Sequence, residues 1–378
     1  MENAKNAKRE SNLELMRIIM MILIIAHHYV VNSGITNMYN FSNITANMLF
    51  LECIGFAGKI MINCFVIITG YFMINKKITL KKILKLYLEV KFYHIIIYLL
   101  LLILGIEQLG IKNILKTLFN IVYNVNIGFT GTFFLLYLLI PFINILINNL
   151  NKKQFSILLG IAIFYFTIIS TFSIFNNTFN EITWYIIVYM IGAFIKLYPN
   201  KFDNSKKIWI FATIISIIFS LGSIMFVNII NNKFNKTLHP YFFVTDAHKI
   251  LAVTTSIALF MMFKNIRIKY SAFINNIAST TFGVLLIHAN SDAMIRFVWQ
   301  DIFAVKEQYF SPNLYIHAIC TVILVYVVCV CIDLLRIKFI EKPFFKYLEN
   351  NNLFMKANNF FEKILYNEDI NNKEESYV

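Results

Sequence analysis

Long apolar runs separated by short polar segments dominate this sequence, and they predict membrane-spanning helices. Residues 18–26, 95–104 and 322–331 are examples of such runs. A helix needs about 20 mostly apolar residues to cross a hydrocarbon core roughly 30 Å thick. The pattern predicts an all-α, polytopic helical bundle with about ten transmembrane helices, at residues 13–31, 51–74, 83–104, 132–147, 155–175, 182–198, 208–230, 250–263, 273–288 and 314–335.

The basic residues between these runs predict the orientation of the bundle. Lys and Arg concentrate in cytoplasmic loops of membrane proteins. A cytoplasmic N-terminus places most of them inside, including Arg336 after the last span. We therefore predict a cytoplasmic tail (1–12), a membrane domain (13–347) and a polar, partly disordered cytoplasmic tail (348–378). An amphipathic stretch around residues 354–364 would lie on the inner surface. Trp184 and Tyr185 at one end of the sixth span, and Tyr198 at the other, resemble interfacial anchors.

Composition excludes a soluble protein. Of 378 residues, 58% are hydrophobic and only 14% are charged, whereas soluble proteins average about 25% charged. The net charge of +14 fits basic loops facing anionic lipid headgroups, so membrane lipids, and not nucleic acid, are the expected partners. These features predict a multi-pass protein of the cell (cytoplasmic) membrane.

The cysteines do not predict a metal site. Their spacing matches no metal-ligand motif, and we interpret them as buried packing residues: Cys53, Cys64, Cys320, Cys329 and Cys331.

Two polar residues of the first span form a candidate site. Ionisable groups within spans are costly, so each is a functional candidate. Arg17 and His28 are eleven residues apart, which at about 100° per residue returns to within roughly 20° of one helix face. At about 1.5 Å per residue, His28 lies roughly 16 Å from Arg17 along that stripe, in the outer half of the membrane.

Other polar residues are expected near the depth of His28. The predicted topology places His288 at a similar depth, at the outer end of the ninth span. Asp292, one turn further along, would orient the His288 ring if the helix continues. Glu52 and Lys59 also fall in the outer half of the second span. This set suits acid–base chemistry near the outer face.

Each of these residues also has a simpler interpretation. Arg17 can extend to the inner headgroups, and His27 can be structural. Glu52 and Lys59 can neutralise each other, and so can the third-span residues Glu89, Lys91 and His94. The Arg17–His28 pair on one face, with His288 at matching depth, favours a functional site.

With these residues, the chain resembles acyltransferase family 3 of bacterial membrane proteins, in its surface-polysaccharide O-acetyltransferase branch. The family signature of an Arg, ten residues and a His is matched by Arg17 and His28. The second-span segment 58–72 carries Asn63, Phe65, Gly70 and Phe72, and Lys82 and Lys85 stand where the family often has a basic pair. The segments 184–192, 282–288 and 341–343, the last reading Glu-Lys-Pro, are also similar.

The resemblance implies transfer of an acyl group, usually acetyl from acetyl-CoA, to a hydroxyl of an extracytoplasmic glycan. It implies no permanently bound cofactor, with acyl-CoA as co-substrate. Arg17, Lys82 and Lys85 would bind the phosphates of CoA, although Lys in place of Arg weakens bidentate binding. His28 would act as general base or transient acyl acceptor, together with His288. Supporting or substrate-binding roles would fall to Glu52, Lys59, Asn63, Asp292 and Trp184.

Three other functions remain open from the sequence. A transporter or flippase for a glycan or lipid-linked sugar also buries charges, but often shows repeated halves, and we see none. A membrane-bound O-acyltransferase of the unrelated kind uses a His without the first-span signature. The third is a non-enzymatic assembly or sensor protein. The sequence does not identify the acceptor, the acyl chain or the oligomeric state.

Overall fold

Helices make up all the regular structure in the part of the chain that the computed structural model describes, residues 10–172 and 180–366. The predicted all-α bundle is confirmed. Most of the predicted N-terminal tail (1–9) and the last dozen residues (367–378), including their predicted disorder, lie outside the described residues.

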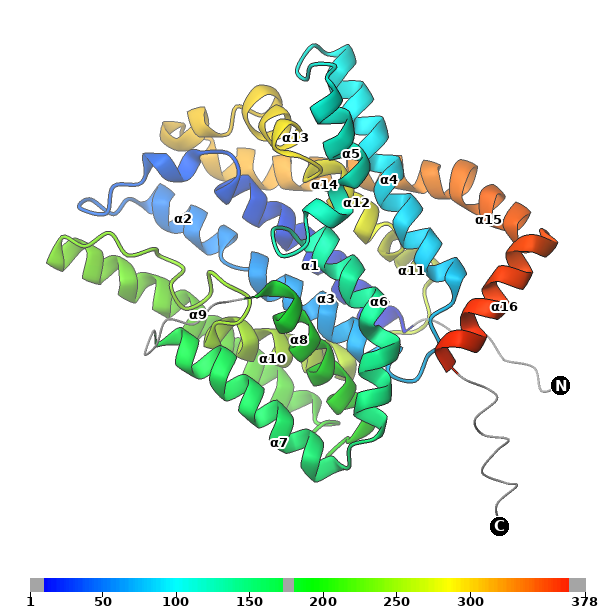
Figure 1. The fold of residues 1–378 in the computed structure, drawn as a ribbon. Coiled ribbons are helices and arrows are strands. Elements are labelled where there is room, and N and C mark those ends of the chain that lie inside the picture. Colours follow the sequence, from blue (N-terminus) through cyan, green and yellow to red (C-terminus); the bar gives the residue numbers. More distant parts are fainter. Residues whose placement is uncertain (1–9, 173–179, 367–378) are drawn as a thin grey trace.

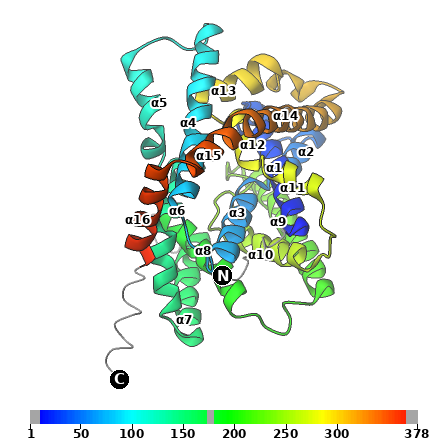
Figure 2. The same ribbon diagram turned by 90° about the vertical axis from the view of Figure 1, so that its right-hand side faces the viewer.

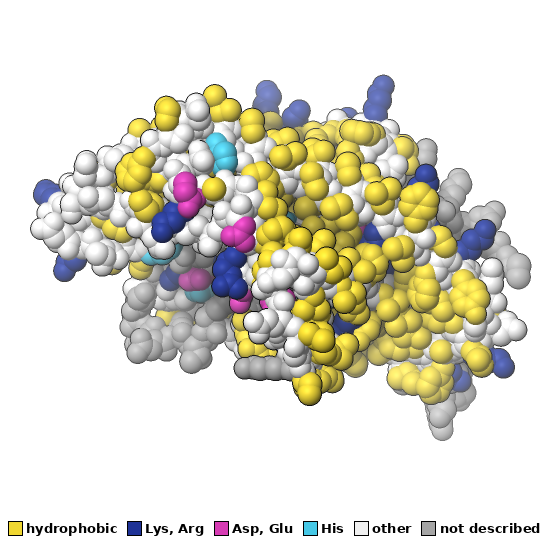
Figure 3. Space-filling view, turned by 90° about the horizontal axis from the view of Figure 1, so that it is seen from above, with side chains coloured by type: hydrophobic (Ala, Val, Ile, Leu, Met, Phe, Trp, Pro, Cys, Tyr) yellow, Lys and Arg dark blue, Asp and Glu magenta, His cyan; other side chains and the backbone are white. Residues whose placement is uncertain are grey.

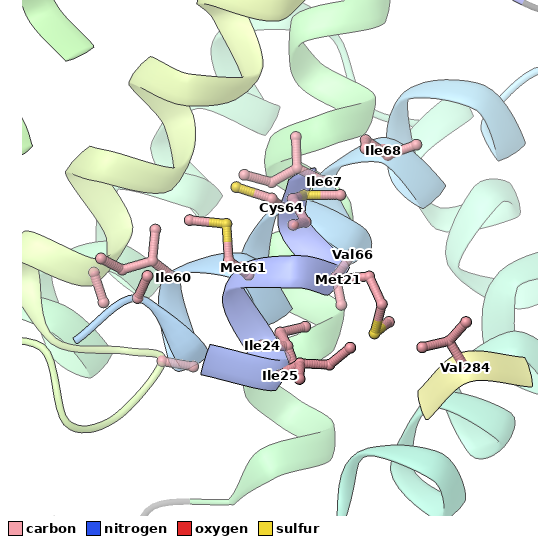
Figure 4. Close-up of a cluster of buried hydrophobic side chains, with 14 of the residues drawn as sticks. Met21, Ile24, Ile25, Ile60, Met61, Cys64, Val66, Ile67, Ile68 and Val284 are labelled. Carbon is pink, nitrogen blue, oxygen red and sulfur yellow. The ribbon is translucent and has the colours of Figure 1, made fainter. Parts of the chain in front are cut away.

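The centre of the molecule is formed by α1 (Ser11–Val31), which packs against α2 (Ala46–Gly55) and α3 (Gly58–Met73). Figure 4 shows Met21, Ile24 and Ile25 of α1 beside the apolar side chains of α3, with Val284 nearby. These helices are apolar on nearly every side, which is typical of helices buried within a bundle.

A close crossing joins α3 to α8 (Glu181–Leu197). A Cβ atom on Gly70 would lie 2.1 Å from the carbonyl oxygen of Tyr189, and one on Gly192 would lie 2.2 Å from that of Ile67. The two glycines therefore let the helix backbones touch, as small residues often do between membrane helices.

The remaining helices surround this centre (Figures 1 and 2). One group comprises α4 (Leu80–Ile103), α5 (Ile111–Tyr123) and α6 (Phe129–Asn148). A second comprises α7 (Lys152–Ile163, extended by a π-helical turn, Phe164–Ile169), α9 (Lys206–Phe234) and α10 (Ile250–Asn265). A third comprises α11 (Ala272–Ala278), α12 (Thr281–His288), α13 (Asp292–Arg296, followed by Phe297–Ile302), α14 (Leu314–Arg336), α15 (Lys342–Glu349) and α16 (Asn352–Tyr366).

Seven helical stretches of the described residues are long and apolar enough to cross a membrane. A bent pair, Ala272–His288 with Asp292–Ile302, would make an eighth. Within the described residues all ten predicted spans fall on helices, and positions 173–175 of the fifth span lie outside those residues. The structure gives at most eight candidate spans, and ten were predicted. The two missing ones are α8 and α10, which have only 17 and 16 residues and are too short to be counted. Seen from above, hydrophobic side chains cover much of the surface, and charged ones gather in a few places (Figure 3). This is the surface of a multi-pass membrane protein.

The structure corrects several details of the sequence interpretation. Trp184 and Tyr185 are buried within the protein and do not lie on its lipid-facing surface. Residues 111–123, predicted as part of a loop, form α5. The last span continues through a π-helical turn (Ile337–Glu341) into α15, because Pro343 stands at the start of α15, where its missing N–H group costs little.

The cysteine prediction was wrong for three of the five residues. Cys64 and Cys329 are buried, but Cys53, Cys320 and Cys331 are exposed on the helix surfaces.

The amphipathic stretch near the C-terminus is helical, as α16. It packs against α4, and the hydroxyl of Tyr366 accepts a hydrogen bond from the backbone N–H of Ile78 at 2.5 Å. Figure 2 shows α16 beside the α4 side of the bundle.

The glycine crossing yields a test of the fold. Gly192→Ala should destabilise the protein by about 1–3 kcal/mol, because the added methyl group overpacks the crossing. Gly222→Ala in α9 is the matched control, since nothing lies within 4 Å of a Cβ atom there. It should be neutral or stabilising by up to about 1 kcal/mol. Thermal unfolding in detergent compares the two, and equal melting temperatures would contradict the close crossing.

Candidate active site

One cavity of about 860 Å³ runs between α1, α3, α4, α5, α6 and α12. Its volume is in the range of ligand sites, about 300–1,000 Å³. Its polar lining includes Arg17, His28, Lys59, Lys82, Lys85, Glu89, His94, Tyr98, Asn113, Lys116, Thr117, Asn120, Asn124, Tyr137, Asn290 and Asp292.

One face of α1 lines this cavity along much of the length of the helix. Arg17, Met21, Ile24 and His28 all contribute to the wall. Their spacing of four, three and four residues keeps them on a single stripe. The structure thus agrees with the predicted common face of Arg17 and His28.

The ring of His28 forms a direct contact with a second histidine from α12. His28 Nδ1 lies 3.0 Å from His288 Nε2, although the two residues are 260 positions apart. The other ring nitrogen of His288, Nδ1, lies 2.6 Å from the carbonyl oxygen of Val284 in the preceding turn. His288 is 1% exposed, so these two contacts determine its hydrogen bonding.

This arrangement determines where the protons lie in the neutral pair. A carbonyl oxygen only accepts, so His288 Nδ1 must carry a proton and donate it to Val284. His288 Nε2 is then an acceptor, and His28 Nδ1 donates to it. The lone pair of His28 is consequently on Nε2, in a ring that lines the cavity. The site presents one unprotonated imidazole nitrogen, suited to take a proton or to attack an electrophile.

The end of α12 explains why Asp292 does not orient His288. The helix ends at His288, and the chain bends by 93° before α13 begins at Asp292. The predicted orienting role of Asp292 was therefore wrong. The carboxylate lines the large cavity, while the backbone of α12 itself holds the ring of His288.

Three cationic residues of the cavity wall lie toward the N-terminal ends of α1 and α4. They are Arg17, Lys82 and Lys85. Arg17 lies 3.5 Å from Glu14, and Lys82 donates to the carbonyl oxygen of Lys77 at 2.7 Å. Lys85 lies 2.6 Å from Glu341. The three residues predicted to bind an anionic molecule thus line one cavity, and each also has a partner within the protein.

A buried charge network supports this end of the cavity, and the sequence interpretation missed it. Arg336, counted from sequence as a cytoplasmic loop residue, is 6% exposed. Its guanidinium donates to Asp333 at 2.6 Å, to Glu341 at 2.8 Å and to Glu89 at 2.9 Å. Glu89 therefore pairs with Arg336 and not with Lys91 or His94. Burial of charge is tolerated only when every group is paired in this way.

The packing of α12 depends on the same network. A Cβ atom on Gly283 would lie 2.3 Å from the carboxyl group of Asp333. Asp333 also accepts a hydrogen bond from the hydroxyl of Tyr93 at 2.6 Å. Because Gly283 has no side chain, α12 lies close against α14 at this position. The next residue, Val284, carries the carbonyl group that contacts His288.

A second cavity of about 210 Å³ adjoins the other side of His28 and is lined by His27 and Lys59, among others. The ring of His27 lies 2.5 Å from the carbonyl oxygen of Gly55, a contact that fits a structural role. Lys59 lines both cavities. Lys59 and Glu52 do not pair in the described part of the chain, because α2 ends between them at Gly55.

Three predicted supporting residues lie outside the cavities. Glu52 is fully buried and accepts a hydrogen bond from Asn228 at 2.5 Å. Asn63 accepts from the indole N–H of Trp184 at 3.1 Å and donates to Ala247 at 2.6 Å. These contacts join α3 to α8 and to the segment before α10, so the structure places Asn63 and Trp184 in packing positions.

The sequence interpretation also missed the wall that α5 forms. Asn113, Lys116, Thr117 and Asn120 line the cavity. Their spacing of three, one and three residues is that of one helix face. This spacing is the sequence pattern that could have predicted the wall. The interpretation left this segment in the loop between the third and fourth predicted spans.

All residues that line the large cavity lie within the part of the chain that matches a known protein family. A family model of the acyltransferase 3 family, described as an acyltransferase domain, matches residues 10–334. Neither a curated protein nor a solved structure matches the chain.

The proton positions of the histidine pair can be tested without any substrate. We expect His28 and His288 both to show the Nδ1–H tautomer in ¹⁵N NMR of histidine-labelled protein at neutral pH. His28→Gln and His288→Gln assign the two signals. An Nε2–H tautomer for His28 would contradict the derived arrangement.

Proposed function

The chain belongs to the acyltransferase 3 family, and on that premise we propose that this membrane acyltransferase moves an acetyl group from acetyl-CoA to a glycan hydroxyl. The acceptor hydroxyl would lie on the extracytoplasmic side of the cell membrane. Acyl-CoA is then a co-substrate, and the proposal requires no resident cofactor.

The observation that carries the proposal is the hydrogen-bonded series from Val284 through His288 to His28. It leaves the lone pair of His28 on Nε2, in a ring that lines the large cavity. A general base must face its substrate with an available lone pair, and this one is oriented by a second, almost fully buried ring.

In the proposed reaction, His28 Nε2 takes the proton of the acceptor hydroxyl as that oxygen attacks the thioester carbonyl carbon. The new C–O bond forms, the C–S bond breaks, and the proton passes from His28 to the departing thiolate. While His28 is protonated, its hydrogen bond to His288 is charge-assisted and therefore stronger. The alternative, in which Nε2 itself accepts the acyl group, starts from the same lone pair.

The cationic end of the cavity would bind the donor. The phosphate groups of CoA are anionic, and Arg17, Lys82 and Lys85 supply positive charge around one volume. The stripe from Arg17 to His28 spans roughly 16 Å along α1. A bound CoA would thus hold its phosphates near Arg17 and extend its acyl end toward His28.

Charge distribution supports the proposed direction of transfer. Basic loops favour a cytoplasmic N-terminus, and Arg17 lies near the N-terminal end of α1. The donor end then faces the cytoplasm, where acyl-CoA is made, and the His28 end faces outward. Anionic lipid headgroups would bind the same basic loops.

The first test measures the product in cells. We expect O-acetyl signals in surface glycan NMR with wild type and their loss with His28→Ala at equal membrane abundance, because removing a general base costs about 10²–10⁴-fold. His317→Gln is the control, since His317 contacts Tyr29 at 2.9 Å and lines neither cavity. If all alleles acetylate alike while glycan export changes, a transporter would explain the chain better.

The second test separates donor binding from chemistry. Arg17→Lys should raise the KM for acetyl-CoA about 10-fold or more, because a hydrogen bond to a charged group is worth ~1.5–3 kcal/mol. The kcat should change little. Arg267→Lys, at an exposed position between α10 and α11, is the matched control. Equal KM values for the two variants would exclude Arg17 from the donor site.

A further inference from the structure

The wall that α5 contributes to the large cavity has a chemistry different from that of the cationic end. Its cavity-lining side chains are mostly neutral amides, hydroxyls and an aromatic ring, with one lysine: Asn113, Lys116, Thr117, Asn120, Tyr123 and Asn124. The opposite face of α5 is apolar and exposed, at Leu115, Phe119 and Val122 for example. This helix therefore turns its polar face inward, toward the cavity, and its apolar face toward lipid.

One buried side chain of this wall, Asn120, has a hydrogen-bond donor without a partner among the described residues. Asn120 is 5% exposed, and its Nδ2 donor has no hydrogen-bond partner among the described residues. A buried amide N–H group left unpaired costs about 1–3 kcal/mol. A ligand in the cavity that offers an acceptor oxygen would remove this cost.

A neighbouring lysine determines which end of the amide is left unpaired. Lys91 of α4 donates to Asn120 Oδ1 at 3.1 Å and also to the carbonyl oxygen of Leu118. Because the ammonium group only donates, it selects the oxygen of the amide and leaves Nδ2 for another partner. The hydrogen bond from Lys91 thus fixes the orientation of the Asn120 amide without a ligand.

The wall also lies at the depth of the histidine pair. Lys91 is three residues from His94 on α4, and His94 hydrogen-bonds the side chain of Asn290. Asn290 is two residues beyond His288 and donates to the carbonyl oxygen of Leu286 at 2.9 Å. Asn120 and His28 therefore line the same cavity, and Lys91, which contacts Asn120, lies about 9–14 Å along α4 from Lys85 and Lys82.

The end of α5 is fixed to α6 by backbone packing. A Cβ atom on Gly131 would lie 2.4 Å from the carbonyl oxygen of Ile121. The backbone N–H of Asn126 donates to Thr132 at 2.9 Å. Asn120 directly precedes Ile121, so its backbone lies beside this close contact between α5 and α6.

We propose that the cavity-facing side of α5, centred on Asn120, is the binding surface for the acceptor sugar. Neutral amides and hydroxyls match the hydroxyl and ring oxygens of a carbohydrate, whereas three cations at the far end match phosphate. The inference rests on the proposed acyl transfer and assigns the acceptor half of that site. Bound sugar would accept the Asn120 Nδ2–H bond and present a neighbouring hydroxyl to His28.

Asn120→Asp tests this surface with almost no change of shape. The carboxylate keeps an oxygen for Lys91 but replaces the unpaired Nδ2 donor with an acceptor. Purified protein in proteoliposomes is supplied with [¹⁴C]acetyl-CoA and with the p-nitrophenyl β-glucoside, β-galactoside and β-N-acetylglucosaminide as probes. For the glycoside that wild type acetylates fastest, the variant should raise KM about 3- to 10-fold. The KM for acetyl-CoA should stay within two-fold of wild type.

Val122→Thr, a change of similar size on the lipid-facing side of α5, is the control and should leave both KM values unchanged. An unchanged glycoside KM in Asn120→Asp would overturn the inference. So would a raised acetyl-CoA KM alone, which would assign the wall to the donor. If the wild-type protein binds acetyl-CoA but acetylates no glycoside, the proposed acceptor class itself fails, and this inference fails with it.

Discussion

The hydrogen bond from His288 Nδ1 to the carbonyl oxygen of Val284, at 2.6 Å, is the constraint on which the site depends. It determines the tautomer of His288, which in turn makes His28 the donor in the contact between the rings. Only then does His28 present a lone pair to the cavity. The bond lies within α12, and the close approach of Gly283 to Asp333 packs this helix against α14.

Charge is accommodated in this apolar bundle in two different ways. Arg336 is surrounded by Glu89, Asp333 and Glu341, so its burial is compensated by direct pairing. Arg17, Lys82 and Lys85 instead border a cavity of about 860 Å³. Polar groups at membrane depth are tolerated when they line such a cavity. Paired charges thus support the structure, while the three cavity-lining cations, each with a partner of its own in the protein, also border a volume large enough for a ligand.

Sequence patterns predicted the helices and the Arg17–His28 stripe because both are local consequences of apolar run length and helical period. The pairing of His28 with His288 was anticipated only as similar depth, since the contact depends on how α1 and α12 pack. The role of Arg336 was missed because a basic residue at the end of an apolar run looks like a loop residue. The wall formed by α5 was missed because its 13 residues are too few to cross a membrane.

The central claim is that one cavity joins a donor site on one side of the membrane to an acceptor site on the other. Sealed proteoliposomes with uniform protein orientation test it most directly, with [¹⁴C]acetyl-CoA supplied only to the side of the N-terminus and a glycoside probe trapped on the opposite side. The account predicts acetylated glycoside in the opposite compartment and none after the two substrates exchange sides. Acetylation only when both substrates share one compartment would contradict it.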